Sequence, residues 1–345
     1  MRAFVFSGGA NRGALQAGAT LALLEAGITP DLIVSSSVGA INGAVLAASP
    51  SLDGVRQTAE RWKTVRCDEV FPGNRAMSLW RLMRGLGSLH DNRALRRFIL
   101  GLLPANVHRF SDLTVPLFVT ATRYQTGEMH LFGHDPQERL IDALMASCAV
   151  PPYLPPYRYR DELYIDGGFV ANLPLSVAVA QGATEIWALE IGVDAASASP
   201  AISMRGSVMR SFETLMRMQM SREHELVRLM QQSGVIVHRI QMLHYSSIDV
   251  HDFSHSAALM GLGYQTAQTY LDTRASFAPV QPPASPSRRE LLRAAWQTST
   301  AAQANLARLR VESLRNLRVE SLRTLWPRRQ PAVVPLPVDK NGPVV

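Results

Sequence analysis

Residues 2–44 read RAFVFSGGANRGALQAGATLALLEAGITPDLIVSSSVGAINGA, and this stretch decides the fold. Residues 2–7 have the apolar pattern of a buried strand, and residues 14–26 have the amphipathic pattern of a helix that stops at Gly27. The apolar run at 31–36 predicts a second strand. A strand, a helix and a strand in that order form a βαβ unit, whose strands run parallel with a right-handed crossover.

The same alternation continues along the chain. Further apolar runs predict strands at 115–123, 128–133, 162–166, 185–192 and 234–241. Helical patterns fill much of the space between them. The alternation favours an α/β fold in which helices cover both faces of a sheet.

Length and composition exclude several classes of protein. With 345 residues, 47% of them apolar, the chain can form one large α/β domain, alone or with an appendage. No apolar stretch reaches the length of about 18 residues that a transmembrane span needs, and no signal-like segment precedes the first strand. Cys67 and Cys148 are too few for a disulfide framework and lack CxxC spacing, which favours reduced thiols in the cytoplasm and excludes a cysteine-held zinc.

The positive charge is confined to the C-terminal part of the chain. Residues 285–345 hold eleven Lys or Arg and four acids, a net charge of +7 that equals that of the whole chain, so residues 1–284 are neutral. The Pro-, Ala- and Ser-rich segment 277–287 is typical of a linker. In the tail, the near-repeat at 308–324, rich in Leu, Arg and Glu, predicts a helix over roughly residues 286–326 that ends before Pro327. Two interpretations stay open: a solvated extension, or a helix that binds an anionic membrane surface.

Three serines stand in a row where the second predicted strand ends and a helical pattern begins. A residue on such a turn has its side chain pushed out of the sheet, next to helix N–H groups that can hold an oxyanion, which suits a nucleophile. The usual signature is G-x-S-x-G. Ser37 takes the nucleophile position and Gly39 is in place, but Ser35 replaces the leading glycine. The alternative is that the serines only end the strand and cap the helix.

The segment SGGANRGALQAG, residues 7–18, follows the first strand and opens a helix. The N–H groups of Gly8, Gly9 and Ala10 can therefore form an anion-binding loop. A dinucleotide site would need an acid at the end of the second strand, where serines stand, and a P-loop would need G-K-[ST], which neither of the chain's two lysines supplies. An oxyanion hole needs only glycine-bordered N–H groups beside a nucleophile, and this interpretation fits best.

A serine nucleophile also needs a base. None of the nine histidines stands in a recognisable motif. Asp166 ends a strand-like run and is followed by Gly167 and Gly168, which let the backbone turn tightly and leave the carboxylate near whatever lies opposite. The alternative for this segment is an Asp-Gly hairpin turn. The stretch 244–255 gathers three histidines and two aspartates, but in no recognisable ligand spacing, so we expect no metal.

Three separated blocks together resemble the patatin-like phospholipase family: SGGANRG after the first strand, SSSVGAINGA at the turn, and DGGFVANLPL around Asp166. Weaker similarities extend the resemblance over residues 2–195. The resemblance implies a three-layer α/β/α fold with a mainly parallel central sheet, and a Ser-Asp dyad that acts on phospholipids and other acyl lipids without a metal or other cofactor. Together with the composition of the C-terminal part, it divides the chain into a catalytic domain at 1–276, the linker at 277–287 and a basic helical or disordered tail at 288–345.

Matched position by position, the resemblance implies that Ser37 is the nucleophile and Asp166 the general base. The oxyanion hole is then the backbone of Gly8, Gly9 and Ala10. The residues that support these motifs are Arg12, Gly13, Ser35, Gly39, Gly167 and Gly168.

Two positions depart from the family's pattern. Ser35 stands for the glycine before the nucleophile, and Ala10 stands for the last of the consecutive glycines in the loop. Neither change removes a reacting group, so the resemblance favours a lipid acyl hydrolase of the phospholipase A or lysophospholipase type. The cysteines favour the cytoplasm, and the basic tail leaves open a peripheral contact with anionic membrane. The alternative is a catalytically weakened lipid-binding or regulatory protein of the same fold. We expect no nucleic acid partner.

Overall fold

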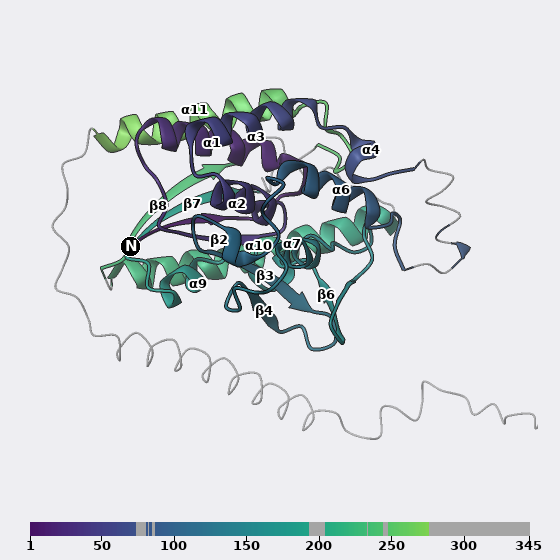
Figure 1. Cartoon of the computed structure of the whole chain (residues 1–345). Helices are drawn as coiled ribbons and strands as arrows, with labels where there is room; N and C mark the ends of the chain where they lie inside the picture. The colour runs from purple at the N-terminus through teal and green to yellow at the C-terminus, as the bar shows by residue number, and fades with distance from the viewer. Residues whose placement is uncertain are drawn as a thin grey trace, which may run out of the picture. The chain divides into compact units, whose positions relative to one another are not determined.

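The computed structural model describes residues 1–73, 81, 83–84, 87–192, 204–232, 234–243 and 248–275. These residues form an α/β fold around one eight-stranded sheet (Figure 1). The strands are β1 (Arg2–Phe6), β2 (Leu32–Ser36), β3 (Leu117–Arg123), β4 (Met129–Phe132), β5 (Tyr157–Tyr159), β6 (Glu162–Ile165), β7 (Glu185–Ile191) and β8 (Ile236–Met242).

The sheet is mixed but mostly parallel at its centre. Its strands follow the order β5-β6-β3-β2-β1-β7-β8, and β4 pairs with β3. The pairs β1–β2, β1–β7, β2–β3 and β7–β8 are parallel, whereas β3–β4, β3–β6 and β5–β6 are antiparallel. The predicted βαβ unit is confirmed: β1 and β2 are parallel neighbours, and Phe6 lies opposite Ser35, so the two strands end side by side.

Helices cover both faces of this sheet, as predicted. In the described residues they are α1 (Gly13–Glu25), α2 (Val38–Ala48), α3 (Leu52–Thr64), α4 (Cys67–Val70), α6 (Arg93–Leu102), α7 (Leu140–Ser147), α8 (Gly168–Ala171), α9 (Leu175–Ala180), α10 (Met204–Gln232) and α11 (Ser256–Ala275), with 3-10 turns η1 (Ala10–Arg12) and η2 (Phe110–Asp112). Figure 1 shows α1, α3 and α11 on one face and α9 and α10 on the other. The fold is therefore built in three layers.

Strand β1 illustrates how the two faces are filled. Side chains of a strand alternate between faces. Phe4 and Phe6 are buried in the larger core with residues of α1, α2 and α11, whereas Ala3 and Val5 are buried in a smaller core with residues of α9 and α10. Full burial of a side chain such as Phe or Val contributes about 1.5–3 kcal/mol, so both faces of the central strands stabilise the sheet.

Helices α1 and α11 pack against each other with their backbones in contact. A Cβ atom placed on Gly18 would overlap the backbone carbonyl of Met260, and one placed on Gly263 would overlap the backbone carbonyl of Leu15. Only glycine, which has no side chain, lets the two backbones approach this closely.

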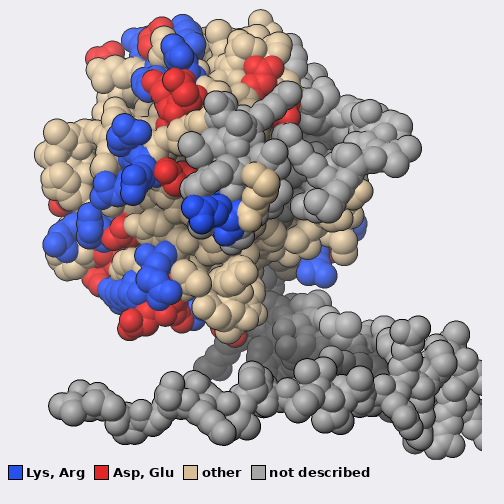
Figure 2. Space-filling view, turned by 90° about the vertical axis from the view of Figure 1, so that its right-hand side faces the viewer, with Lys and Arg blue, Asp and Glu red and all other residues tan. Residues whose placement is uncertain are grey.

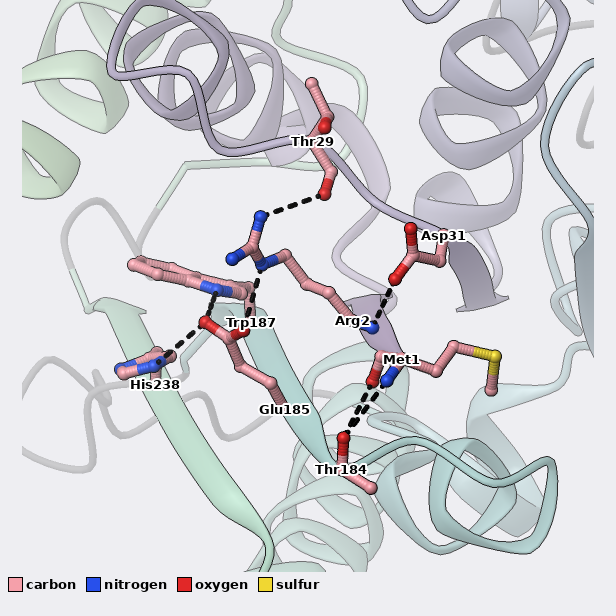
Figure 3. Close-up of polar contacts among 8 residues, drawn as sticks. All are labelled: Met1, Arg2, Thr29, Asp31, Thr184, Glu185, Trp187 and His238. Carbon is pink, nitrogen blue, oxygen red and sulfur yellow. Dashed lines mark hydrogen bonds and ion pairs between the residues drawn. The ribbon is translucent and has the colours of Figure 1, made fainter.

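A polar network closes the end of the sheet where β1 and β7 begin (Figure 3). Glu185 accepts hydrogen bonds from Arg2 Nε at 3.0 Å and from Trp187 Nε1 at 2.9 Å. His238 stacks on Trp187 with ring centroids 4.1 Å apart. Burial, reinforced by the charge of Arg274, lowers the pKa of His238 to about 4, so its ring is neutral at pH 7.

The predicted linker at 277–287 and tail at 288–345 lie outside the described residues, and so does any contact of the tail with a membrane. They stay predictions. Within the part of the chain that the structure describes, no helix combines the length and the apolar character needed to cross a bilayer.

Candidate active site

Ser37 occupies a sharp turn between the end of β2 and the start of α2. Its φ of 55° and ψ of −130° lie in a region that residues other than glycine rarely adopt. Its backbone N–H donates to Ser147 Oγ at 2.8 Å, which fixes the turn from α7. A Cβ on Gly39 would lie 2.5 Å from the carbonyl oxygen of Ser7, so the glycine two residues after Ser37 lets α2 begin against the end of β1.

The other two serines have different environments. Ser35 Oγ donates to the carbonyl oxygen of Phe118 in β3 at 3.4 Å. A Cβ on Gly43 would lie 3.2 Å from Ser35 Oγ, so the side chain that replaces the usual glycine occupies space that Gly43 leaves open. Ser36 Oγ is buried and has no hydrogen-bond partner among the described residues. The departure at Ser35 is therefore accommodated by a compensating small residue on α2.

Asp166 follows β6 and faces Ser37. Its carboxylate accepts a hydrogen bond from Ser37 Oγ at 2.6 Å and one from the backbone N–H of Gly168 at 2.8 Å. Its own backbone is held on both sides, because its N–H donates to Ala149 O and its carbonyl accepts from Thr122 Oγ1. Burial raises the pKa of Asp166 to about 6, although the hydrogen bonds from Ser37 and Gly168 act in the opposite direction. The carboxylate is thus ionised at pH 7 but unusually basic.

The two glycines after Asp166 lead into the short helix α8, so the hairpin alternative for this segment is wrong. A Cβ on Gly167 would lie 2.7 Å from both Ser36 Oγ and Thr120 Oγ1. Gly167 therefore allows the chain to pass close to the end of β2, and this close approach brings the carboxylate to Ser37.

The glycine loop lies beside this pair. Gly8 donates its N–H to the carbonyl oxygen of Asn172 at 3.0 Å, and Arg12 Nε donates to Gly9 O at 3.2 Å. Ala10 has a φ of 54°, the left-handed region that favours glycine. For the N–H groups of Gly9 and Ala10, no acceptor lies among the described residues.

Ser37, Asp166 and the glycine loop line one cavity of about 140 Å³. Its other walls are mostly apolar and come from α2, α3, α4, α6, β7, α10 and loops that include the one after α7. Those apolar side chains include Val38, Ile41, Trp62, Val70, Phe71, Leu95, Phe98, Val150, Leu154, Ile191, Met216 and Phe253. Cys148 also lines the cavity, and burial, with the nearby charge of Asp166, raises its pKa well above the usual value, so the thiol is uncharged.

Among the described residues, neither a histidine nor a group of metal ligands belongs to this cavity lining. His90 and His251 contact each other through their Nε2 atoms at 3.1 Å, outside the cavity lining. No three His, Cys, Asp or Glu side chains among the described residues are grouped as metal ligands, although His244 of the stretch 244–255 lies outside them.

Figure 2 views the molecule from the side on which α4 and α6 lie in Figure 1. Positive and negative side chains are interspersed on the described surface of this face. The neutral balance of residues 1–284 is therefore visible as mixed charge on the part of this face that the structure describes.

Three residues that organise the site were not predicted from the sequence. Ser147 holds the nucleophile turn, Asn172 accepts from Gly8, and Asn42 donates to Gly13. Asn42 and Asn172 stand inside the blocks SSSVGAINGA and DGGFVANLPL. Their place in those blocks was the available signal, because Asn alone indicates no particular role.

Fold and site together define an α/β protein with a serine-carboxylate pair at an apolar cavity. The chain belongs to the patatin-like phospholipase family, since the family model described as Patatin-like phospholipase matches residues 4–179.

Individual relatives share a low sequence identity with this chain. Patatin-like phospholipase domain-containing protein 7 of Rattus norvegicus is 29% identical over 200 residues, which cover 55% of this chain and 13% of that protein. Lysophospholipase NTE1 of Mycosarcoma maydis is 27% identical over 192 residues, with coverage of 54% and 9%. The chain thus spans a small part of the length of these relatives. The crystal structure of VipD from Legionella pneumophila has a TM-score of 0.44 and 14% identity, covering 79% of this chain and 67% of that one.

Proposed function

We propose that the protein is a lipid acyl hydrolase that cleaves carboxylic esters through a Ser37 acyl-enzyme. The observation that carries this proposal is the 2.6 Å hydrogen bond from Ser37 Oγ to the buried carboxylate of Asp166 at an apolar cavity. A hydroxyl on a strained turn, in contact with a base whose pKa is raised to about 6, has the arrangement of an activated nucleophile.

In the first half of the reaction, Ser37 Oγ attacks the ester carbonyl carbon while its proton passes to Asp166. The N–H groups of Gly9 and Ala10 donate to the oxyanion that forms, because the N–H of Gly8 already donates to Asn172. The tetrahedral intermediate then collapses, and the leaving alcohol takes the proton from Asp166.

In the second half, water enters and Asp166 removes its proton as the oxygen attacks the acyl-enzyme. The same two N–H groups hold the second oxyanion, and collapse releases a fatty acid and restores the Ser37 hydroxyl. Asp166 thus acts as base and as acid in turn, and the mechanism requires no histidine.

The cavity favours an acyl chain as the group bound beside Ser37. Its walls are aliphatic and aromatic, and burial of each methylene of a chain contributes about 0.8 kcal/mol. Relatives carry the names phospholipase and lysophospholipase, which agrees with a substrate that has a fatty acyl ester. We therefore propose phospholipids or lysophospholipids as the substrate class.

The test measures hydrolysis of p-nitrophenyl acyl esters, a phospholipid and a lysophospholipid by the wild type, Ser37→Ala and Ser36→Ala. We expect Ser37→Ala to lose about 10³-fold or more of the activity, because the nucleophile is removed. Ser36→Ala is the matched control: it removes the neighbouring hydroxyl, which has no partner among the described residues, and retains activity.

An organophosphonate probe identifies the serine directly by mass spectrometry. Labelling that persists in Ser37→Ala shows that another serine is the nucleophile. A wild type that binds lipid but hydrolyses none of the three substrates supports the alternative, a lipid-binding protein of the same fold.

A further inference from the structure

Three buried side chains, Gln16, Asn42 and Trp62, form one hydrogen-bond network between α1, α2 and α3. Asn42 Nδ2 donates to Gly13 O at 2.9 Å and to Gln16 Oε1 at 3.0 Å. Trp62 Nε1 donates to Asn42 Oδ1 at 2.9 Å. Gln16 Nε2 donates to Ser7 O at 2.8 Å, and it also donates to a carbonyl oxygen of β7.

The network fixes the orientation of both amides. An amide side chain has two N–H donors and one carbonyl acceptor. In Asn42 and in Gln16 both donors and the acceptor are used. Rotation of the Asn42 amide by 180° would place its NH₂ group against the N–H of Trp62 and its oxygen against Gly13 O, so only the observed orientation is stable.

The contacts of this network lie at both ends of the glycine loop. Ser7 precedes the loop and Gly13 follows it, and each accepts a hydrogen bond through its carbonyl oxygen. Asn42 itself belongs to α2, the helix that begins directly after Ser37. The network therefore joins the segment that carries the proposed oxyanion donors to the helix that begins directly after the proposed nucleophile.

Trp62, the third residue of the network, forms part of the cavity wall. Trp62 is 2% exposed and lines the cavity, and its ring lies against the end of the glycine loop. A Cβ placed on Gly13 would lie 2.8 Å from the indole Cζ2 atom. The same Asn42 side chain thus holds both the loop and one wall of the acyl cavity.

We propose that Asn42 is a positioning residue, which sets the distance between the oxyanion donors and Ser37 and holds Trp62 in the cavity wall. This inference rests on the proposed function of the site. Displacement of an oxyanion donor weakens a hydrogen bond that matters most in the transition state, so loss of Asn42 lowers kcat more than it raises KM.

The experiment compares Asn42→Ala with Thr20→Val at a temperature where both are folded. Thr20 is buried in α1 and donates to Gln16 O, so its variant loses a buried hydrogen bond without touching the amides of the network. We expect Asn42→Ala to lower kcat on a p-nitrophenyl ester by about 10-fold to 100-fold, as for a displaced or lost oxyanion donor, and Thr20→Val to leave it unchanged.

A pair of inhibitors separates positioning from a structural defect. An alkyl trifluoromethyl ketone forms an oxyanion on Ser37, so Asn42→Ala weakens its binding by the same factor as kcat/KM. The alkyl alcohol of equal chain length forms no oxyanion, and its binding changes much less. Equal weakening of both inhibitors overturns the proposal.

Trp62→Phe is the milder variant and decides the question if Asn42→Ala does not fold. It keeps an aromatic ring but removes the N–H that holds Asn42 Oδ1, and we expect kcat to fall by about 3-fold to 10-fold. An unchanged kcat in every folded variant of the network overturns the proposal.

Hydrogen exchange gives a readout that does not depend on hydrolysis. If the wild type is inactive, the proposed function fails, but the positioning claim is still decided. Faster exchange of the hydrogen-bonded amides of Gly8 and Arg12 in Asn42→Ala or Trp62→Phe than in Thr20→Val supports it, because the loop has lost its attachment to α2. Equal exchange in those residues overturns it.

Discussion

Two carboxylates, the half-buried Glu185 and the buried Asp166, occupy opposite ends of the sheet, and they differ in how they are stabilised. At the end where β7 begins, burial would raise the pKa of Glu185, but hydrogen bonds and charge from Trp187 and Arg2 outweigh it and lower the pKa. At the end where β1 and β2 finish, burial dominates and raises the pKa of Asp166 to about 6. Glu185 is stabilised as an anion, and Asp166 is not.

Backbone strain also differs between these two ends of the sheet. Ser37 and Ala10, both at the cavity, have positive φ values without being glycine. The network in Figure 3 contains no such residue, and its Glu185 carboxylate accepts hydrogen bonds from donors on β1 and β7. The difference indicates that one end of the sheet is organised for stability, whereas the other retains strain and an unfavourable charge at the proposed nucleophile and base.

The largest expected effect is that of Asp166→Asn. Activity falls by about 10³-fold because the base is lost. The same change raises the free energy of unfolding at pH 8 by about 1–3 kcal/mol, because it removes a buried charge whose pKa is raised by about 2 units, each equivalent to about 1.4 kcal/mol. Urea titrations at several pH values measure this gain.

The pH dependence of that gain has a defined sign. Above pH 6 Asp166 is ionised in both folded and unfolded chains and destabilises the fold; below its ordinary pKa of 3.8 it is protonated in both. The advantage of Asp166→Asn should therefore grow from about pH 4 to about pH 6 and stay constant above. An Asn variant no more stable than the wild type at pH 8 contradicts the contrast between the two carboxylates.

The second prediction concerns the pH profile of catalysis. Because Asp166 must be ionised to accept the proton of Ser37, kcat/KM on a soluble ester falls about tenfold per pH unit below a pKa of about 6. The stability of the fold is monitored over the same range by circular dichroism. A kcat/KM that stays flat down to pH 4.5 rules out Asp166 as the base.

The third prediction applies to the other carboxylate. Glu185→Gln lowers the free energy of unfolding at pH 7 by about 1–3 kcal/mol, since donors from Arg2 and Trp187 lose a charged acceptor. The lowered pKa of Glu185 means that its contribution is present above its ordinary pKa of 4.5 and is lost as the pH falls. Activity is unchanged in stopped assays at 25 °C. If Glu185→Gln is as stable as the wild type, the Glu185 anion does not stabilise the fold, and the contrast with Asp166 is wrong.

The smallest expected effect is that of Ala10→Gly. Glycine adopts a φ of 54° without steric cost, so the variant gains about 0.5–1 kcal/mol of stability and keeps its activity within a few fold. Gly27→Ala is the matched reverse change: Gly27 has a φ of 74° and open space around it, so alanine there destabilises by a similar amount without an effect on catalysis. Thermal unfolding of the two variants should shift in opposite directions.

The central part of the fold could be predicted from the sequence for a physical reason. Strands buried on both faces, such as β1 and β2, contain uninterrupted apolar runs, Ala3–Phe6 and Leu32–Val34, and the glycine-bordered loop between β1 and α1 marks where the first strand ends. β5 could not be predicted, because its sequence Tyr-Arg-Tyr is three residues long and only partly buried, which leaves no periodicity to detect.

The meeting of the proposed nucleophile and base could be predicted from the sequence, but the contacts that support them could not. Ser37 and Asp166 meet in one cavity, as the motifs indicated. The engagement of the Gly8 N–H by Asn172, and the room that Gly43 leaves for Ser35, depend on contacts between segments distant in sequence. Local patterns carry no record of such contacts. The same holds for the apolar wall, which residues as far apart as Trp62 and Phe253 build together.

The glycine contact between α1 and α11 constrains how such sequences can diverge. Gly18 lies inside the residues matched by the family model, whereas Gly263 lies beyond them. A side chain at either position would overlap the backbone of the other helix. A substitution at one position is therefore selected against as long as the two helices pack this closely. Among homologues that retain this packing, the two positions should remain small together or change together. A family profile that stops before α11 contains only one member of this coupled pair.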